Sequence, residues 1–115
     1  MKKTDFLFLL QEIWEQEGML NYLRINFIDE KKCSLELLEK IILFGLDKGY
    51  FILFDINERV LDKNKYYEII LNEKNWFVEH FKYEVIFDNL AFWRKSLFVD
   101  KKIPEEFKEL NGIFL

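Results

Sequence analysis

Aromatic side chains are dense in this chain, whereas residues that favour turns are scarce. The 115 residues include 13 Phe, five Tyr and three Trp, but only four Gly and one Pro. Half of the residues are apolar and a third are charged, which is enough to fill a core and to solvate a shell. A chain of this length can bury roughly 60–70% of the surface that it exposes when unfolded. We therefore expect a single globular domain over residues 1–115 that needs no disulfides.

Apolar residues at helical spacing predict three helices. The first is expected over 4–17 and the second over 34–48, where Ser34 is the expected N-cap and Gly49 the left-handed residue that follows the helix. A third, more polar helix is expected over 62–74. The side chains that we expect to be buried are Phe6, Leu9, Leu10 and Ile13 in the first helix, Leu37, Leu38, Ile41, Ile42 and Leu46 in the second, and Tyr66, Ile69, Ile70 and Trp76 in or after the third.

Shorter apolar patterns predict strands between these helices. The continuous run at 50–54 is typical of a buried strand, and the alternating run at 81–87 is typical of a half-buried one. Residues 21–28 also alternate, which favours a strand but leaves a helix open. Residues 88–97 fit either the second strand of a hairpin or a short helix that carries Trp93. The pattern does not separate these two alternatives.

The C-terminal part of the chain begins with a helix-start signal. Pro104 is followed by two glutamates, an arrangement that is common in the first turn of a helix. Phe114 and Leu115 are apolar, so the tail is expected to pack against the domain. Together these patterns predict an α+β fold: one small domain with three to four helices and a small, mostly antiparallel sheet.

Net charge and cysteine content restrict the partners and the compartment. The formal net charge is −4, and the chain shows no basic stretch of the kind that proteins use to neutralise phosphates. We therefore expect no nucleic-acid partner and a preference for basic protein partners. Cys33 is the single cysteine, which suits a reducing compartment. No apolar run approaches the length that spans a bilayer, so we expect a cytoplasmic protein without a membrane partner. The oligomeric state stays open.

Catalytic and metal-binding chemistry has few residues to work with. His80 is the only imidazole, and no sequence motif places Cys33 or a serine beside it. One His and one Cys fall short of the three or four N and S ligands that zinc prefers. The four glycines do not form a phosphate-binding loop. We therefore expect no enzyme activity, no metal and no cofactor, and keep a small enzyme that uses His80 as the third interpretation.

One surface of the first predicted helix has the composition of a protein interface. Asp5, Phe8, Glu12 and Glu15 follow one another at i, i+3, i+7 and i+10, so they share a face opposite the buried stripe. An aromatic ring among carboxylates resembles the centre and rim of an interaction surface. A neighbouring loop that covers Phe8 would explain the same residue without any partner. We predict that these four residues bind a partner.

Residues 35–76 resemble a family of small acidic bacterial proteins. The matching features are Leu37-Leu38, a helix that ends in Leu46-Asp47-Lys48-Gly49, the apolar run at 50–54, and a charged helix followed by Trp76. The chain differs from the family where Phe77 follows this Trp, because Pro is common there. These features resemble the immunity proteins of polymorphic-toxin and contact-dependent growth inhibition systems. The resemblance implies a fold and a genomic setting, and no binding residue carries over.

The function that these features favour is inhibition of another protein. We expect an immunity protein that binds a cognate toxin domain with a basic surface and neutralises it by steric occlusion. The alternative is a non-catalytic subunit or a homodimer that uses the same aromatic side chains for assembly. Both readings need a partner-binding surface, and they differ in whether the partner is a second copy of the chain.

Overall fold

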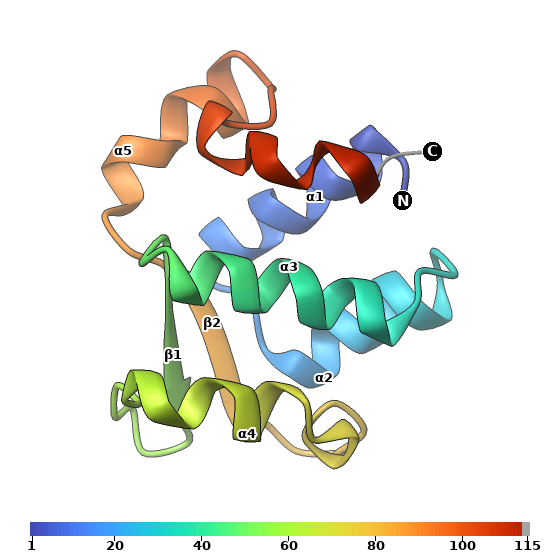
Figure 1. Cartoon of the computed structure of the whole chain (residues 1–115), viewed down its shortest axis with the longest axis vertical. Helices are drawn as coiled ribbons and strands as arrows, with labels where there is room; N and C mark the ends of the chain where they lie inside the picture. The colour runs from blue at the N-terminus through green and yellow to red at the C-terminus, as the bar shows by residue number, and fades with distance from the viewer. Residues whose placement is uncertain (114–115) are drawn as a thin grey trace.

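Two antiparallel strands lie at one side of the molecule, and helices pack above, below and across them (Figure 1). The computed structural model describes residues 1–113, apart from the side chain of Asn111. Strand β1 (Phe51–Asp55) pairs with β2 (Tyr83–Phe87), so both predicted strands are confirmed. The described residues form one compact α+β globule with five α-helices, more than the three to four that the sequence predicts.

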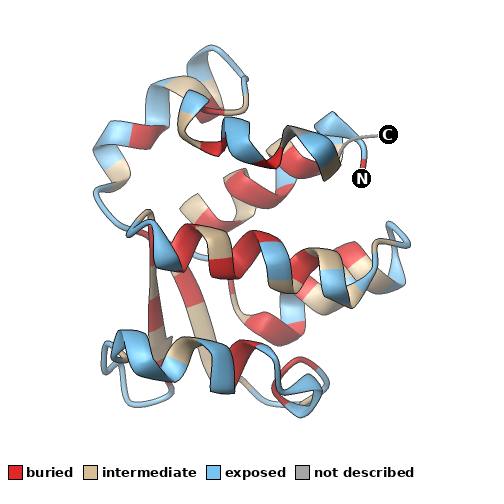
Figure 2. Cartoon of the chain, in the orientation of Figure 1, coloured by how far each residue is buried: buried red, intermediate tan, exposed pale blue. Residues whose placement is uncertain are grey.

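The two long helices form where apolar stripes and caps predict them. Helix α1 spans Lys3–Trp14, and α3 spans Leu35–Asp47. The Ser34 hydroxyl accepts a hydrogen bond from the backbone N–H of Leu37 at 3.1 Å, which satisfies one free amide of the first turn. Gly49 has a φ of +78° after the end of α3, as expected. Figure 2 shows the buried side of both helices in red; all four predicted core residues of α1 have no exposed surface.

Residues 21–28 are helical, so the strand prediction for this segment is wrong. Helix α2 (Leu20–Leu23) continues directly into a π-helical segment, Arg24–Asp29. The apolar alternation is misleading because Ile25 faces outward with 38% of its surface exposed. The side chains that reach the core follow helical spacing instead: Leu20, Leu23 and Phe27.

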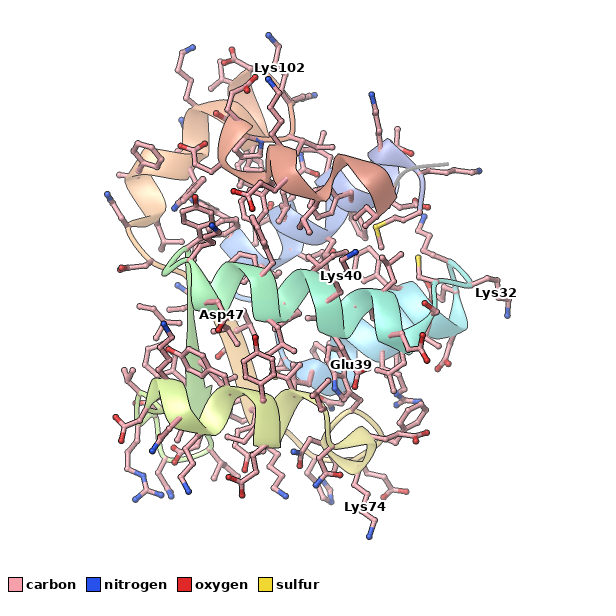
Figure 3. The ribbon with its side chains drawn as sticks, in the orientation of Figure 1. Lys32, Glu39, Lys40, Asp47, Lys74 and Lys102 are labelled. Atoms are coloured by element: carbon pink, nitrogen blue, oxygen red, sulfur yellow. The ribbon has the colours of Figure 1, made fainter. Side chains whose placement is uncertain are left out.

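Residues 62–74 are helical but discontinuous, where a single helix was predicted. Helix α4 covers only Tyr66–Ile70, and short 3-10 turns lie on both sides of it. The helix packs on α3, where Asp47 accepts a hydrogen bond from the Tyr67 hydroxyl (Figure 3). Trp76 is fully buried, as predicted, and its indole N–H donates to the carbonyl of Ile70 at 2.8 Å.

Residues 88–97 adopt the helical alternative, and the hairpin is wrong. Helix α5 (Leu90–Arg94) starts after Asn89, whose φ of +55° turns the chain away from the sheet. A second π-helical segment, Lys95–Val99, continues α5. Trp93 is buried, and its indole N–H donates to the carbonyl of Asp88 at 2.8 Å.

The two π-helical segments are built alike, although they lie far apart in the sequence. Each one closes with a backbone hydrogen bond between residues five apart, and each is followed by a lysine with positive φ. Each also carries an ion pair between residues five apart, a spacing that brings two side chains together when the helix is widened to i→i+5 bonding. The pairs are Arg24–Asp29 at 3.2 Å and Lys95–Asp100 at 3.0 Å.

The C-terminal segment completes the core. A 3-10 helix, Glu105–Ile113, follows the buried Pro104, so the predicted helix start is confirmed in a tighter form. Phe107 from this segment is fully buried and meets six aromatic rings at centroid distances of 5.4–6.2 Å: Phe6, Phe44, Tyr50, Phe51, Phe87 and Trp93. Part of the Phe content therefore serves the core, whereas Phe8, Phe77 and Phe92 are exposed. The expected packing of Phe114 and Leu115 concerns residues outside the described part of the chain.

Candidate functional site

The interface predicted on α1 divides into two halves with different surroundings. At the N-terminal half, Asp5 lies 3.8 Å from the Lys31 ammonium, and this ammonium lies 5.7 Å from the centre of the Phe8 ring. The Phe27 ring packs 5.5 Å from Phe8. Phe8 keeps 39% of its surface exposed, so the segment that follows α2 covers it in part. This half is therefore partly neutralised and partly covered.

At the C-terminal half, further carboxylates from outside the predicted face lie near Glu12 and Glu15. Glu12 is half-buried on α1, and Glu15 is exposed at the end of the helix. Burial raises the pKa of Glu12, and the negative charges of Glu15 and Glu17 raise it further. Glu84 on β2 adjoins this group: burial raises its pKa, and the negative charge of the nearby Glu17 raises it further. Within residues 1–113 these four carboxylates form no ion pair, so their charge is uncompensated.

Glu84 also lies on an apolar surface of the sheet. Opposite residues of an antiparallel ladder share a face, and the register places Phe54 beside Glu84 and Ile52 beside Ile86. Isolated bridges extend the first of these rows on both sides, with Val60 next to Phe54 and Met19 next to Glu84. We call this surface the outer sheet face; its residues are Met19, Ile52, Phe54, Val60, Glu84 and Ile86.

The outer sheet face is separate from the core. The inward side chains of the strands, such as Leu53 and Val85, are fully buried, as the alternation along each strand requires. Ile52, Phe54 and Ile86 are only half-buried, and in the described part of the chain they do not pack against the core. Val60 is exposed at the edge of this face, and partly exposed apolar surface beside charged groups is a candidate site for binding other proteins.

The residues considered for catalysis are not brought into one group. Cys33 is half-buried, and burial, followed by the charge of Asp5, raises the pKa of its thiol. The other groups that act on this thiol are the amino terminus and Lys31, and His80 is not one of them. His80 is exposed in the loop before β2, beside a shallow hollow formed with Val78 and Phe81. The geometry therefore does not assemble a thiol–imidazole pair.

Among residues 1–113, no three His, Cys, Asp or Glu side chains gather in a way that would hold a metal ion. None of the described helices has the length and apolar character to cross a membrane. Comparison of the chain with protein-family models, curated proteins and solved structures finds no match.

Sequence reasoning found one part of the candidate site and missed the other. Glu12 and Glu15 were identified from their spacing on one helix. Glu84 and its apolar neighbours were missed, because pairing between β1, β2 and the residues around Met19 arises only in the fold. The alternation of 81–87 did contain a signal: it places Glu84 and Ile86 together, opposite the buried Val85.

Proposed function

We propose that this chain is an immunity-type protein that binds a cognate bacterial toxin domain and neutralises it by steric occlusion. The observation that carries the proposal is the outer sheet face, an apolar surface that holds the uncompensated carboxylate of Glu84. Glu17 adds negative charge beside Glu84, and Glu12 and Glu15 continue this acidic group at the end of α1. The resemblance of residues 35–76 to immunity proteins supports the same interpretation.

The raised pKa of Glu84 indicates what kind of group a partner would supply. Burial disfavours the charged carboxylate, and Glu17 repels it. A lysine or arginine of the partner would offset both effects, because a desolvated charge is stabilised most by an opposite charge with hydrogen-bond donors. Ile52 and Phe54 would supply the apolar contact around this ion pair. The surrounding glutamates would accelerate the encounter with a basic partner, with a strong dependence on salt.

The molecule is large enough for an inhibitory interface of ordinary size. A standard complex buries about 800 Å² on each partner. This is about one-ninth of the 6871 Å² that the described chain exposes. Occlusion would need no chemistry from this chain, only an interface over the toxin's substrate-binding surface.

Self-association through the same surface is disfavoured by charge. A two-fold dimer places one patch against its own copy, so Glu84 and the neighbouring glutamates would face the same residues of the second chain. Like charges in an interface cost several kcal/mol. The outer sheet face therefore suits a basic partner better than a second copy, and we place the homodimer second.

The test is rescue of growth from the toxin. We would express the C-terminal domain encoded by the reading frame immediately upstream in a bacterial host, with and without this chain. We expect the domain alone to stop growth and the wild-type chain to restore it. Glu84→Lys should abolish the rescue, whereas Glu30→Lys, the same change at an exposed residue that is not part of the outer sheet face, should not. A harmless upstream domain, or equal rescue by both variants, contradicts the proposal.

A further inference from the structure

A groove lies at the other end of α1, between its first turns and the loop that precedes the C-terminal 3-10 helix. Its volume is about 400 Å³, which is within the range of small-molecule sites. Leu7, Ile103 and Pro104 line it with apolar surface. Four lysines complete the lining: Lys3, Lys101, Lys102 and Lys108. The groove therefore combines apolar walls with a positively charged rim.

The charge of this groove is opposite to that of the whole chain. Among residues 1–113, Glu105 is the only carboxylate that lines it, and its charge is matched by Lys108 at 3.6 Å. The nearby Asp100 pairs with Lys95 at 3.0 Å, outside the groove lining. Lys101 and Lys102 form no ion pair with the carboxylates of residues 1–113. A protein with a net charge of −4 thus keeps an uncompensated positive site.

The backbone fixes the positions of these two lysines. Lys101 takes a φ of +53°, a conformation that side-chain-bearing residues adopt at some cost. The backbone N–H of Lys102 donates to the carbonyl of Ser96 at 2.8 Å, which ties the turn after the π-helical segment back onto that segment. Figure 3 labels Lys102 at the top of the molecule, on this loop. Two adjacent cations are therefore held at the groove by a hydrogen-bonded turn.

We propose that this groove binds a small amphipathic organic anion. The anionic group, a carboxylate, sulfonate or phosphate ester, would lie against Lys101 and Lys102 and reduce the repulsion between them. The apolar body of the ligand would cover Leu7, Ile103 and Pro104 and remove their surface from water. A long polyanion such as nucleic acid is disfavoured, because the positive surface is confined to one groove of an acidic molecule. The site is independent of the outer sheet face.

The test uses 8-anilino-1-naphthalenesulfonate, a fluorescent anion with an apolar aromatic body. Titration of the native protein, followed by fluorescence and by backbone amide NMR shifts, should give saturable binding at one site. We expect shifts at the backbone amides of Thr4, Leu7, 101–103 and 105–108. The double variant Lys101→Glu/Lys102→Glu should weaken binding by roughly tenfold or more, and higher salt should weaken binding to the wild type.

A matched variant and two further probes make the outcome decisive. Lys63→Glu/Lys74→Glu changes the net charge equally at exposed residues away from the groove lining, and should leave the affinity unchanged. The uncharged analogue N-phenyl-1-naphthylamine and inorganic phosphate should each bind more weakly than the anionic dye, because each lacks one half of the recognised chemistry. Equal weakening in both double variants, equal binding of the uncharged analogue, or shifts confined to the outer sheet face would overturn the proposal. None of these results depends on the toxin partner.

Discussion

Phe107 should be the single side chain on which the stability of this core depends most. It is fully buried in a 3-10 helix near the C-terminus, and it meets six aromatic rings from α1, α3, α5, the two strands and the turn before β1. Truncation of a buried Phe to Ala costs about 3–5 kcal/mol, through lost transfer free energy and the cavity that remains. Because the ring is shared by so many elements, we expect Phe107→Ala to lie at the upper end of this range.

The loss is measurable by urea denaturation with tryptophan fluorescence. At slopes of about 1–3 kcal/mol per molar urea, a loss of 4 kcal/mol lowers the midpoint by about 1–4 M. If the Ala variant is unfolded without urea, Phe107→Leu keeps most of the apolar volume and should cost about 1–3 kcal/mol.

The matched control is another Phe that makes few contacts. Phe92 is 59% exposed, and among the described rings it stacks only on Trp93, edge-to-face at 4.9 Å. We expect Phe92→Ala to cost less than about 1 kcal/mol. A Phe107→Ala loss no larger than that of Phe92→Ala would show that the C-terminal segment does not hold the aromatic core together.

Three further perturbations test other parts of the structure. Gly18→Ala should destabilise the fold by about 1–3 kcal/mol or more, because the added Cβ would lie 2.0 Å from the Val85 carbonyl oxygen. The control is Gly49→Ala, whose added Cβ would have no neighbouring atom within 4 Å. In the same urea experiment it should cost only about 1 kcal/mol, for the left-handed φ of this residue. The raised pKa of Glu84 means that folding favours its protonated form, so stability from this group is present below its unfolded pKa of about 4.3 and is lost as pH rises through the folded pKa. Glu84→Gln should therefore be more stable than wild type at pH 7 and equally stable near pH 3.5, and a wild type that is the more stable at pH 7 would contradict this. Because burial raises the pKa of the Cys33 thiol, its alkylation by iodoacetamide at pH 7.5 should be several-fold slower than the alkylation of glutathione. An equal rate would show that the protein does not perturb this thiol.

The elements that the sequence predicts correctly are specified by features within a few residues of each other. Helix α3 carries a cap at Ser34, an apolar stripe and a terminal Gly49, and each of these acts within a few residues. In residues 21–28 the sequence alternation predicts the wrong element, because Ile25 is exposed while Leu23 and Phe27 reach the core from a helix. The discontinuity around α4 is also missing from the sequence pattern, because short 3-10 turns on both sides of α4 interrupt the helical period.

The sequence predicts only the part of the candidate site that lies on the single helix α1. The spacing of Glu12 and Glu15 on α1 is a local property, and the structure keeps both of them in one uncompensated acidic group. Whether Asp5 and Phe8 stay free depends on Lys31 and Phe27, which approach from another segment. Residues that meet only through the fold leave no trace in the spacing of a single segment.

The C-terminal end of α1 carries charges of the sign that weakens a helix. Anions near this end oppose the helix dipole, at about 0.3–1 kcal/mol for each exposed charge. Glu15 and Glu17 follow the last residue of α1, and its last turn contains no basic residue. Glu15→Lys/Glu17→Lys should therefore stabilise the fold in urea and yet reduce rescue from the toxin. Such a trade of stability for function is expected where a surface is arranged for a partner. A double variant that is less stable, or that rescues as well as wild type, would show that these glutamates are not placed there for binding.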